Sequence, residues 1–156
     1  GASRLSLVHR WVIENEAKFV EGGPTFDLLG GDGFETLIPA AKHLVDFSYY
    51  RWNQGWGIYM GLQYRSASEL RTSAGTLDFS DTLRAVLSLS YELNYADDLL
   101  DALPILEETR LTFGVANALD SITQVQDLNG QTPLLFQEDL IDPVGLGWRV
   151  ELRKRF

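Results

Sequence analysis

The chain has 156 residues, of which 45% are hydrophobic, and it carries 13 basic against 22 acidic residues, a formal charge of −9 at pH 7. Phosphate binding needs a basic footprint, so this charge argues against a nucleic-acid partner. Cysteine is absent, which excludes disulfide frameworks and thiolate metal sites, and no run of about 18 apolar residues is present to form a transmembrane helix.

Six segments alternate apolar and polar residues with the two-residue period of a β-strand. In chain order they span residues 4–13, 43–52, 56–65, 82–93, 109–119 and 144–156. Strands of soluble proteins average about five or six residues, whereas a tilted strand that crosses a bilayer needs about nine to eleven. Five of the six segments keep their alternation for ten residues or more, so their length favours strands that span a membrane.

Turn residues divide the chain unevenly. Asn53-Gln54-Gly55 predicts a short turn that joins residues 43–52 and 56–65 in one hairpin, and pairing Tyr49 with Ile58 places the apolar residues of both strands on one face. The other connections are polar, rich in Gly, Pro, Asp and Asn, and are expected to be loops: residues 14–42, 66–81, 94–108 and 120–143. The apolar stretches within residues 14–42 are about five residues long and are too short to cross a bilayer.

Aromatic residues gather beside the short turn. Trp and Tyr favour the boundary between hydrocarbon and water, where the ring is buried and its polar edge stays wet. We therefore predict an interfacial girdle of Tyr49, Trp52, Trp56 and Tyr91. The alternative is a hairpin whose aromatic rings fill the core of a soluble protein.

If the apolar parity faces lipid, the charged parity faces water inside a barrel, because every strand edge in hydrocarbon has to be paired. Short turns of such barrels lie on the periplasmic side, which makes residues 14–42, 66–81 and 120–143 extracellular. Barrels of this type start at about eight strands, so six strands predict a part of a larger barrel. The chain also begins inside a predicted strand, which indicates a truncated start.

The order of these features resembles the C-terminal part of a TonB-dependent outer-membrane receptor. Residues 111–120, LTFGVANALD, are similar to the family's penultimate-strand motif at Gly114, Val115, Asn117 and Asp120, and depart from it at residues 116, 118 and 119. Residues 38–50, IPAAKHLVDFSYY, resemble a Pro-x-His strand entry with a longer spacing. The final strand is similar to the family's terminal assembly signal, formed here by Trp148, Val150, Leu152 and Phe156.

This resemblance implies an all-β fold: an antiparallel, up-and-down transmembrane barrel of which residues 1–156 are about six C-terminal strands out of about 22. It implies active uptake of a scarce nutrient, such as an iron siderophore, another metal chelate, cobalamin or a glycan, across the bacterial outer membrane. The implied partners are the rest of the barrel and its plug, TonB through an N-terminal region that this sequence lacks, outer-membrane lipids and lipopolysaccharide, and the barrel-assembly machinery.

Two alternatives stay open: a small complete outer-membrane barrel with a structural or adhesive role, and a soluble antiparallel sandwich that binds a ligand. Enzymatic activity is not expected, because the chain has no G-x-S-x-G, phosphate-loop or H-E-x-x-H motif. His9 and His43, the two histidines, are too few to predict a metal site, and His43 is expected to be a strand-end residue; nothing in the sequence calls for a cofactor.

Overall fold

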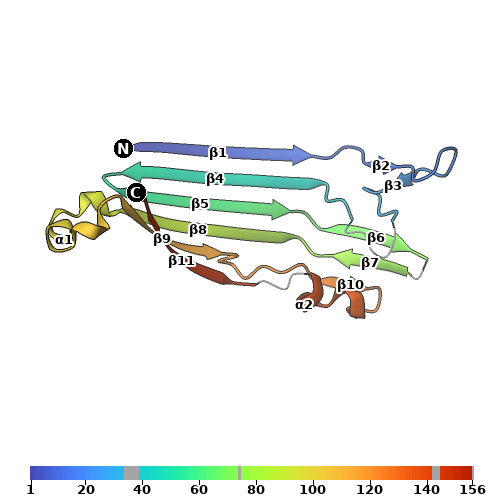
Figure 1. Ribbon diagram of the computed structural model, residues 1–156. Coiled ribbons are helices and arrows are strands. Elements are labelled where there is room, and N and C mark those ends of the chain that lie inside the picture. Colours follow the sequence, from blue (N-terminus) through green and yellow to red (C-terminus); the bar gives the residue numbers. More distant parts are fainter. Residues whose placement is uncertain (34–38, 74, 142–144, 156) are drawn as a thin grey trace.

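The computed structural model describes residues 1–33, 39–73, 75–141 and 145–155. Six long antiparallel strands form one sheet in the order β1-β4-β5-β8-β9-β11 (Figure 1). The strands are β1 (Ala2–Trp11), β4 (His43–Asn53), β5 (Trp56–Arg65), β8 (Thr82–Glu92), β9 (Thr109–Ala116) and β11 (Gly147–Lys154). Each overlaps one of the six predicted segments, so the prediction of an antiparallel all-β fold is confirmed.

The register gives every strand the same two faces. One continuous row of paired residues reads Leu5, Tyr49, Met60, Leu87, Val115 and Trp148 across the six strands. The neighbouring row, which reads Arg4, Tyr50, Tyr59, Ser88, Gly114 and Arg149, lies on the opposite side because successive residues of a strand alternate. The side that carries the Leu87 row is called the apolar face below, and the other side the polar face.

The hairpin of β4 and β5 closes more tightly than predicted. Asn53 pairs with Trp56, so the turn consists of Gln54 and Gly55 alone, both with positive φ (46° and 82°). This is the two-residue turn whose twist matches that of the strands. Tyr49 consequently pairs with Met60, and the predicted pairing with Ile58 is wrong by two residues. A shift by two leaves each side chain on its face, so the predicted faces hold.

Two connections that were expected to be irregular loops form a second, small sheet instead. Its strands are β6 (Ser68–Thr72), β7 (Gly75–Phe79) and β10 (Val125–Asp127), in the order β10-β7-β6. The buried side chains of the chain's hydrophobic cluster gather here: Leu70, Leu77, Phe79, Val125 and Phe136, with Ile141 packed against them. Phe136 belongs to η3 (Leu134–Phe136), which precedes the short helix α2 (Glu138–Ile141).

The two remaining connections contain short elements among their described residues. Residues 14–42 contain β2 (Glu16–Ala17) and β3 (Phe26–Asp27), which pair with each other and are too short to span a bilayer. Residues 94–108 hold α1 (Asp97–Ala102) and η2 (Pro104–Leu106), after η1 (Leu93–Tyr95). Across the described ranges, no helix has both the length and the apolar content needed to cross a membrane.

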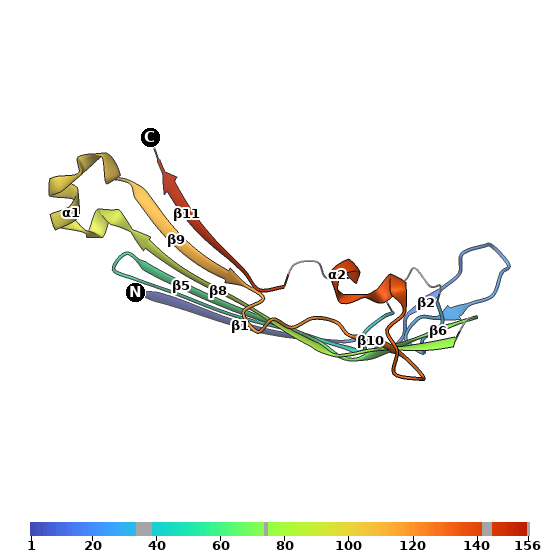
Figure 2. The same cartoon turned by 90° about the horizontal axis from the view of Figure 1, so that it is seen from below.

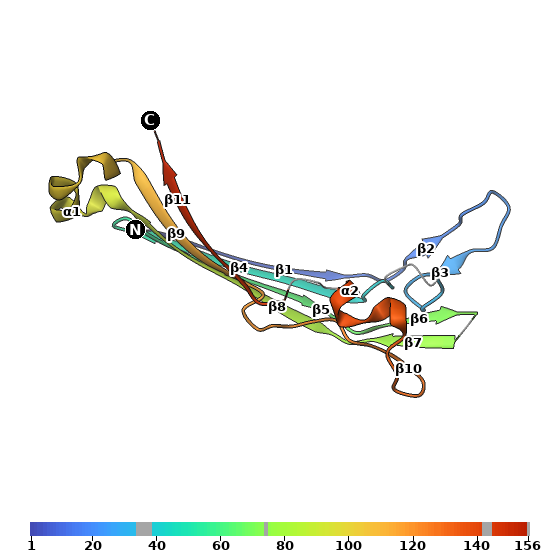
Figure 3. The ribbon, with the colours of Figure 1, turned by 60° about the horizontal axis from the view of Figure 1, so that its bottom comes forward.

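The long sheet is curved and open. β9 and β11 bend away from the plane of β1, β4, β5 and β8, as Figures 2 and 3 show from two directions. Both chain ends and α1 lie at the end of the sheet that carries the Gln54-Gly55 turn, and the small sheet lies at the other end (Figure 1). Among the described strands, β1 and β11 are the two edges and do not pair with each other.

The tight turn provides a test of the fold. Gly55→Ala places a Cβ at positive φ and 2.7 Å from a ring carbon of Tyr95, whereas Gly130→Ala meets the same backbone strain (φ 76°) in open space. The left-handed conformation costs a non-glycine residue about 1–2 kcal/mol, so both variants lower the free energy of unfolding, and Gly55→Ala lowers it more. Denaturant unfolding of the two variants measures the difference. Equal losses would show that the turn does not pack against Tyr95.

Candidate functional site

The apolar face of the long sheet is uncovered. In the part of the chain that the structure describes, no second sheet or helix packs over it, and most of its large side chains are exposed. The exposed members are Leu5, Leu7, Trp11, Trp56, Ile58, Leu83, Leu87, Leu89, Leu111, Phe113, Trp148, Val150 and Leu152. A contiguous apolar surface of this kind marks contact with a membrane or with another protein surface.

The structure separates the four predicted girdle residues. Trp56 and Tyr91 are opposite each other on β5 and β8, and their ring centroids are 4.5 Å apart. Tyr49 shares their face but lies further from the turn, in the row of Met60. Trp52 lies on the polar face, because its parity in β4 is that of Tyr50, so it does not share the apolar face with the other three. The prediction grouped the four residues because they lie near the turn, without considering which face of its strand each one occupies.

The predicted assembly signal lies on the edge strand β11. Trp148, Val150 and Leu152 all belong to the apolar face and pair with β9. These side chains are 75%, 60% and 63% exposed. No described element therefore covers the apolar face of this edge strand. The fourth residue of the signal, Phe156, lies outside the described residues. Lys154 has the same parity, and its Nζ donates to the carbonyls of Ile105 (2.6 Å) and Glu107 (2.8 Å).

Arginine dominates the polar face, although the chain as a whole is acidic. Nine of the 13 basic residues lie in the six long strands, against three of the 22 acidic residues. The arginines of the polar face are Arg4, Arg10, Arg65, Arg84, Arg110, Arg149 and Arg153, and its carboxylates are Asp46, Glu92 and Glu151. Net charge did not reveal this surface, because the acidic residues lie mainly in the connections between the strands.

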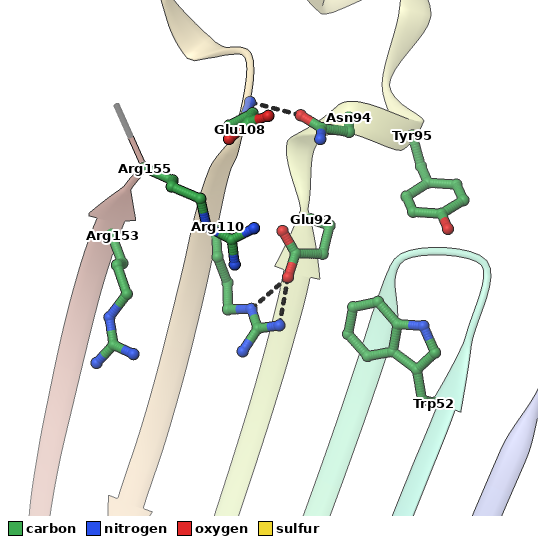
Figure 4. Close-up of a pocket in the computed structure, with 8 residues that line it drawn as sticks. All are labelled: Trp52, Glu92, Asn94, Tyr95, Glu108, Arg110, Arg153 and Arg155. Atoms are coloured by element: carbon green, nitrogen blue, oxygen red, sulfur yellow. Dashed lines mark hydrogen bonds and ion pairs between the residues drawn. The ribbon is translucent and has the colours of Figure 1, made fainter.

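An open hollow of about 360 Å³ lies on the polar face near the end that carries α1 (Figure 4). Arg110 and Glu92 form an ion pair at its floor, with Nε 2.5 Å from the carboxylate, and the Arg110 guanidinium lies 5.6 Å from the ring centroid of Trp52. Arg153 of β11 and Arg155, which follows the end of that strand, also line the hollow. The basic side chains can hold an anionic group here, but one of them is already neutralised by Glu92.

Gly57 explains how the Trp52 ring fits on this face. A Cβ at Gly57 would lie 2.9 Å from the Trp52 ring and 2.5 Å from Oγ of Ser90, too close for any other residue without movement. The indole therefore lies over a strand position that has no side chain. This packing accounts for a large aromatic residue on the polar face, where the sequence pattern predicts small and charged residues.

The structure also brings His9 and His43 together across β1 and β4, with 3.2 Å between Nε2 of His9 and Nδ1 of His43. This contact could not be predicted from the sequence, because 34 residues separate the two histidines along the chain. Among the described residues no group of three or more His, Cys, Asp or Glu side chains is placed to hold a metal ion. Among the described residues, the His9–His43 pair is a contact between reactive side chains that the sequence did not predict.

Comparison with known proteins gives no identification. The chain matches no family model, and neither a curated protein nor a solved structure matches it.

The turn at residues 127–131, which follows β10 of the small sheet, is held by hydrogen bonds to the carboxylate of Asp127. The backbone N–H of Gln131 and that of Asn129 both donate to Oδ1 of Asp127 at 2.8 Å. These hydrogen bonds, that of Gln131 first, hold the pKa of Asp127 below its ordinary value of 3.8. A carboxylate whose pKa is lower in the folded state stabilises it above the unfolded value, and that contribution disappears as the pH falls through the folded value.

We expect the protection of the Asn129 and Gln131 amides against hydrogen exchange to fall as the pH drops below about 4, because the protonated carboxyl group is the weaker acceptor. Asp127→Asn has no titratable group, so its turn loses the pH dependence. Exchange rates corrected for intrinsic pH effects measure this. An equally steep acid loss of protection in Asp127→Asn would assign the effect to another group.

Proposed function

We propose that the chain is part of the wall of a transmembrane β-barrel in the bacterial outer membrane, with the apolar face toward lipid and the polar face toward a water-filled interior. The observation that carries this proposal is the uncovered apolar face of a long, curved, antiparallel sheet. Four of its strands are ten or eleven residues long, which is the length that a tilted strand needs to cross the hydrocarbon layer.

The soluble sandwich fits these surfaces less well. A sandwich buries the inner face of each sheet against a second sheet about 10 Å away. Among the described residues the small sheet lies beyond the end of the long strands and not over them (Figure 3). Leu87, near the middle of the sheet, is 43% exposed, so a sandwich would need a second layer from another molecule.

The open edges favour a larger barrel over a small complete one. β1 and β11 each have a single partner among the described strands, which leaves one side of each backbone unpaired. In hydrocarbon an unpaired N–H or C=O costs several kcal/mol, so additional strands have to lie beside both edges. A barrel also needs at least about eight strands to close around packed side chains.

The similarity of residues 111–120 and of the last strand to TonB-dependent receptors extends the proposal to active nutrient uptake. In such a receptor these strands form part of the barrel, while a plug and TonB couple transport to the energised inner membrane. An arginine-rich interior wall agrees with a barrel that encloses a polar plug and a polar ligand. We propose this receptor role for the whole protein to which the strands belong, not for the strands by themselves.

Site-directed spin labelling tests the lipid-facing assignment. The chain contains no cysteine, so single cysteines at residues 86–91 of β8 give one label each. In reconstituted bilayers we expect residues 87, 89 and 91 to be more accessible to oxygen, and residues 86, 88 and 90 to a water-soluble nickel complex, because the two faces alternate. Power saturation of the spectra measures both accessibilities.

A label at Gln54 serves as the control for this series, since a turn residue outside the strands is accessible to the nickel complex. The same accessibility to nickel at residues 87 and 89 as at residue 54 would place the apolar face in water and remove the membrane assignment. If residues 86, 88 and 90 were instead the ones accessible to oxygen, the arginine face would be toward lipid. That result would also refute the proposed orientation of the sheet.

Uptake by the whole protein tests the receptor role. We expect deletion of its gene to reduce accumulation of one scarce nutrient, an iron chelate, cobalamin or a glycan, and inactivation of TonB to reduce it to the same level. Accumulation that depends on the protein but not on TonB would indicate a passive barrel. Loss of surface attachment without any change in accumulation would favour the adhesive alternative.

A further inference from the structure

Two histidines lie side by side on the apolar face, at the end of the β1–β4 pair that is remote from the Gln54-Gly55 turn. His9 is opposite Val45 and His43 is opposite Trp11, so the two histidines are diagonal neighbours across the pair. Their facing nitrogens, Nε2 of His9 and Nδ1 of His43, are 3.2 Å apart. The chain contains no other histidine and no cysteine, so its strongest transition-metal ligands are concentrated at this point.

His43 is held in place by its surroundings. Its backbone N–H donates to Oγ of Ser66 at 3.1 Å, and the N–H of Ser66 donates to its carbonyl at 2.9 Å. Its half-buried imidazole stacks on the indole of Trp11, with ring centroids 6.2 Å apart, and contacts the imidazole of His9 at 5.4 Å. His9 is exposed, so its ring can turn about its side-chain bonds with little repacking.

The separation of the two nitrogens fits a shared metal ion as well as the hydrogen bond between the rings, once the exposed His9 ring turns so that both lone pairs point at the ion. Imidazole nitrogens bound about 2.0–2.1 Å from one ion, at ligand angles between about 90° and 109°, are about 2.9–3.4 Å apart. The observed 3.2 Å lies within this range. We infer that His9 and His43 form a binding site for one divalent transition-metal ion of the imidazole-preferring class, Cu²⁺, Ni²⁺ or Zn²⁺.

Binding conserves the protons of the pair. In the hydrogen bond between the neutral rings, one of the two facing nitrogens carries a proton. Metal binding needs both facing lone pairs, so that proton passes through water to the other nitrogen of the same ring, Nδ1 of His9 or Nε2 of His43. Both imidazoles remain neutral and no proton is released. Water completes the coordination, since no third His, Asp or Glu joins the pair among the described residues.

The metal would also connect two strands that are distant in sequence. β1 is an edge strand, β4 is its single partner among the described strands, and residues 12–42 separate the two. An ion bound to His9 and His43 ties the end of β1 to β4 where the pair opens into that connection.

Titration of the full chain in detergent micelles with Cu²⁺ tests the site, because Cu²⁺ stands highest in the affinity order of divalent first-row metals. We expect one bound ion by calorimetry and quenching of tryptophan fluorescence from Trp11. His9→Gln and His43→Gln each weaken binding by at least about tenfold, the loss that follows even the removal of a residue that only supports a ligand. Trp11→Phe retains the binding heat and loses most of the quenching.

Arg10→Gln is the matched control, since Arg10 lies next to His9 on the opposite face and its variant should bind Cu²⁺ like the original chain. As a second readout, Cu²⁺ slows hydrogen exchange of the β1 amides in the original chain and not in His9→Gln. Absence of binding in the original chain would refute the inference. Binding of equal strength in the His9→Gln/His43→Gln double variant would also refute it and would assign the ion to the terminal amine or to carboxylates.

Discussion

Backbone pairing among strands that share a two-residue period is the constraint on which the whole structure depends. Opposite residues of an antiparallel pair lie on the same face, so a slip by one residue in a strand would move its apolar row to the arginine side. All five pairings of the long sheet keep the parity. The consequence is one continuous apolar surface and one continuous polar surface. The proposed function assigns lipid to the first and water to the second, and the proposed metal site lies at one end of the apolar surface.

The long strands and their faces could be predicted because the signal is local. Each strand carries its own alternation, and the boundaries of residues 56–65 agree with β5 at both ends. The predicted register of the β4–β5 hairpin was wrong by two residues. The predicted faces were still correct, because side chains alternate between faces with a period of two. The turn itself could not be predicted as a two-residue turn, because Gln54 replaces the Asn or Asp that usually announces positive φ at that position.

Contacts between distant segments are what the sequence could not show. β10 joins β7 across more than forty residues, and its short polar segment buries Val125 only when Phe79 and Phe136 are beside it. The side of the sheet that Trp52 occupies depends on its parity within β4 and on the absence of a side chain at Gly57, and its nearness to the turn suggested otherwise. His9 and His43 meet only after β1 and β4 pair, so their separation in sequence suggested two isolated residues.

The division of charge between strands and connections has a consequence for the field around the molecule. Distant ions respond to the total charge of −9, whereas an ion close to the polar face responds first to the arginines of the strands. Salt screens interactions beyond about 8 Å at physiological ionic strength. Raising the salt concentration therefore weakens the long-range attraction of cations sooner than it weakens the short-range attraction of anions by the sheet.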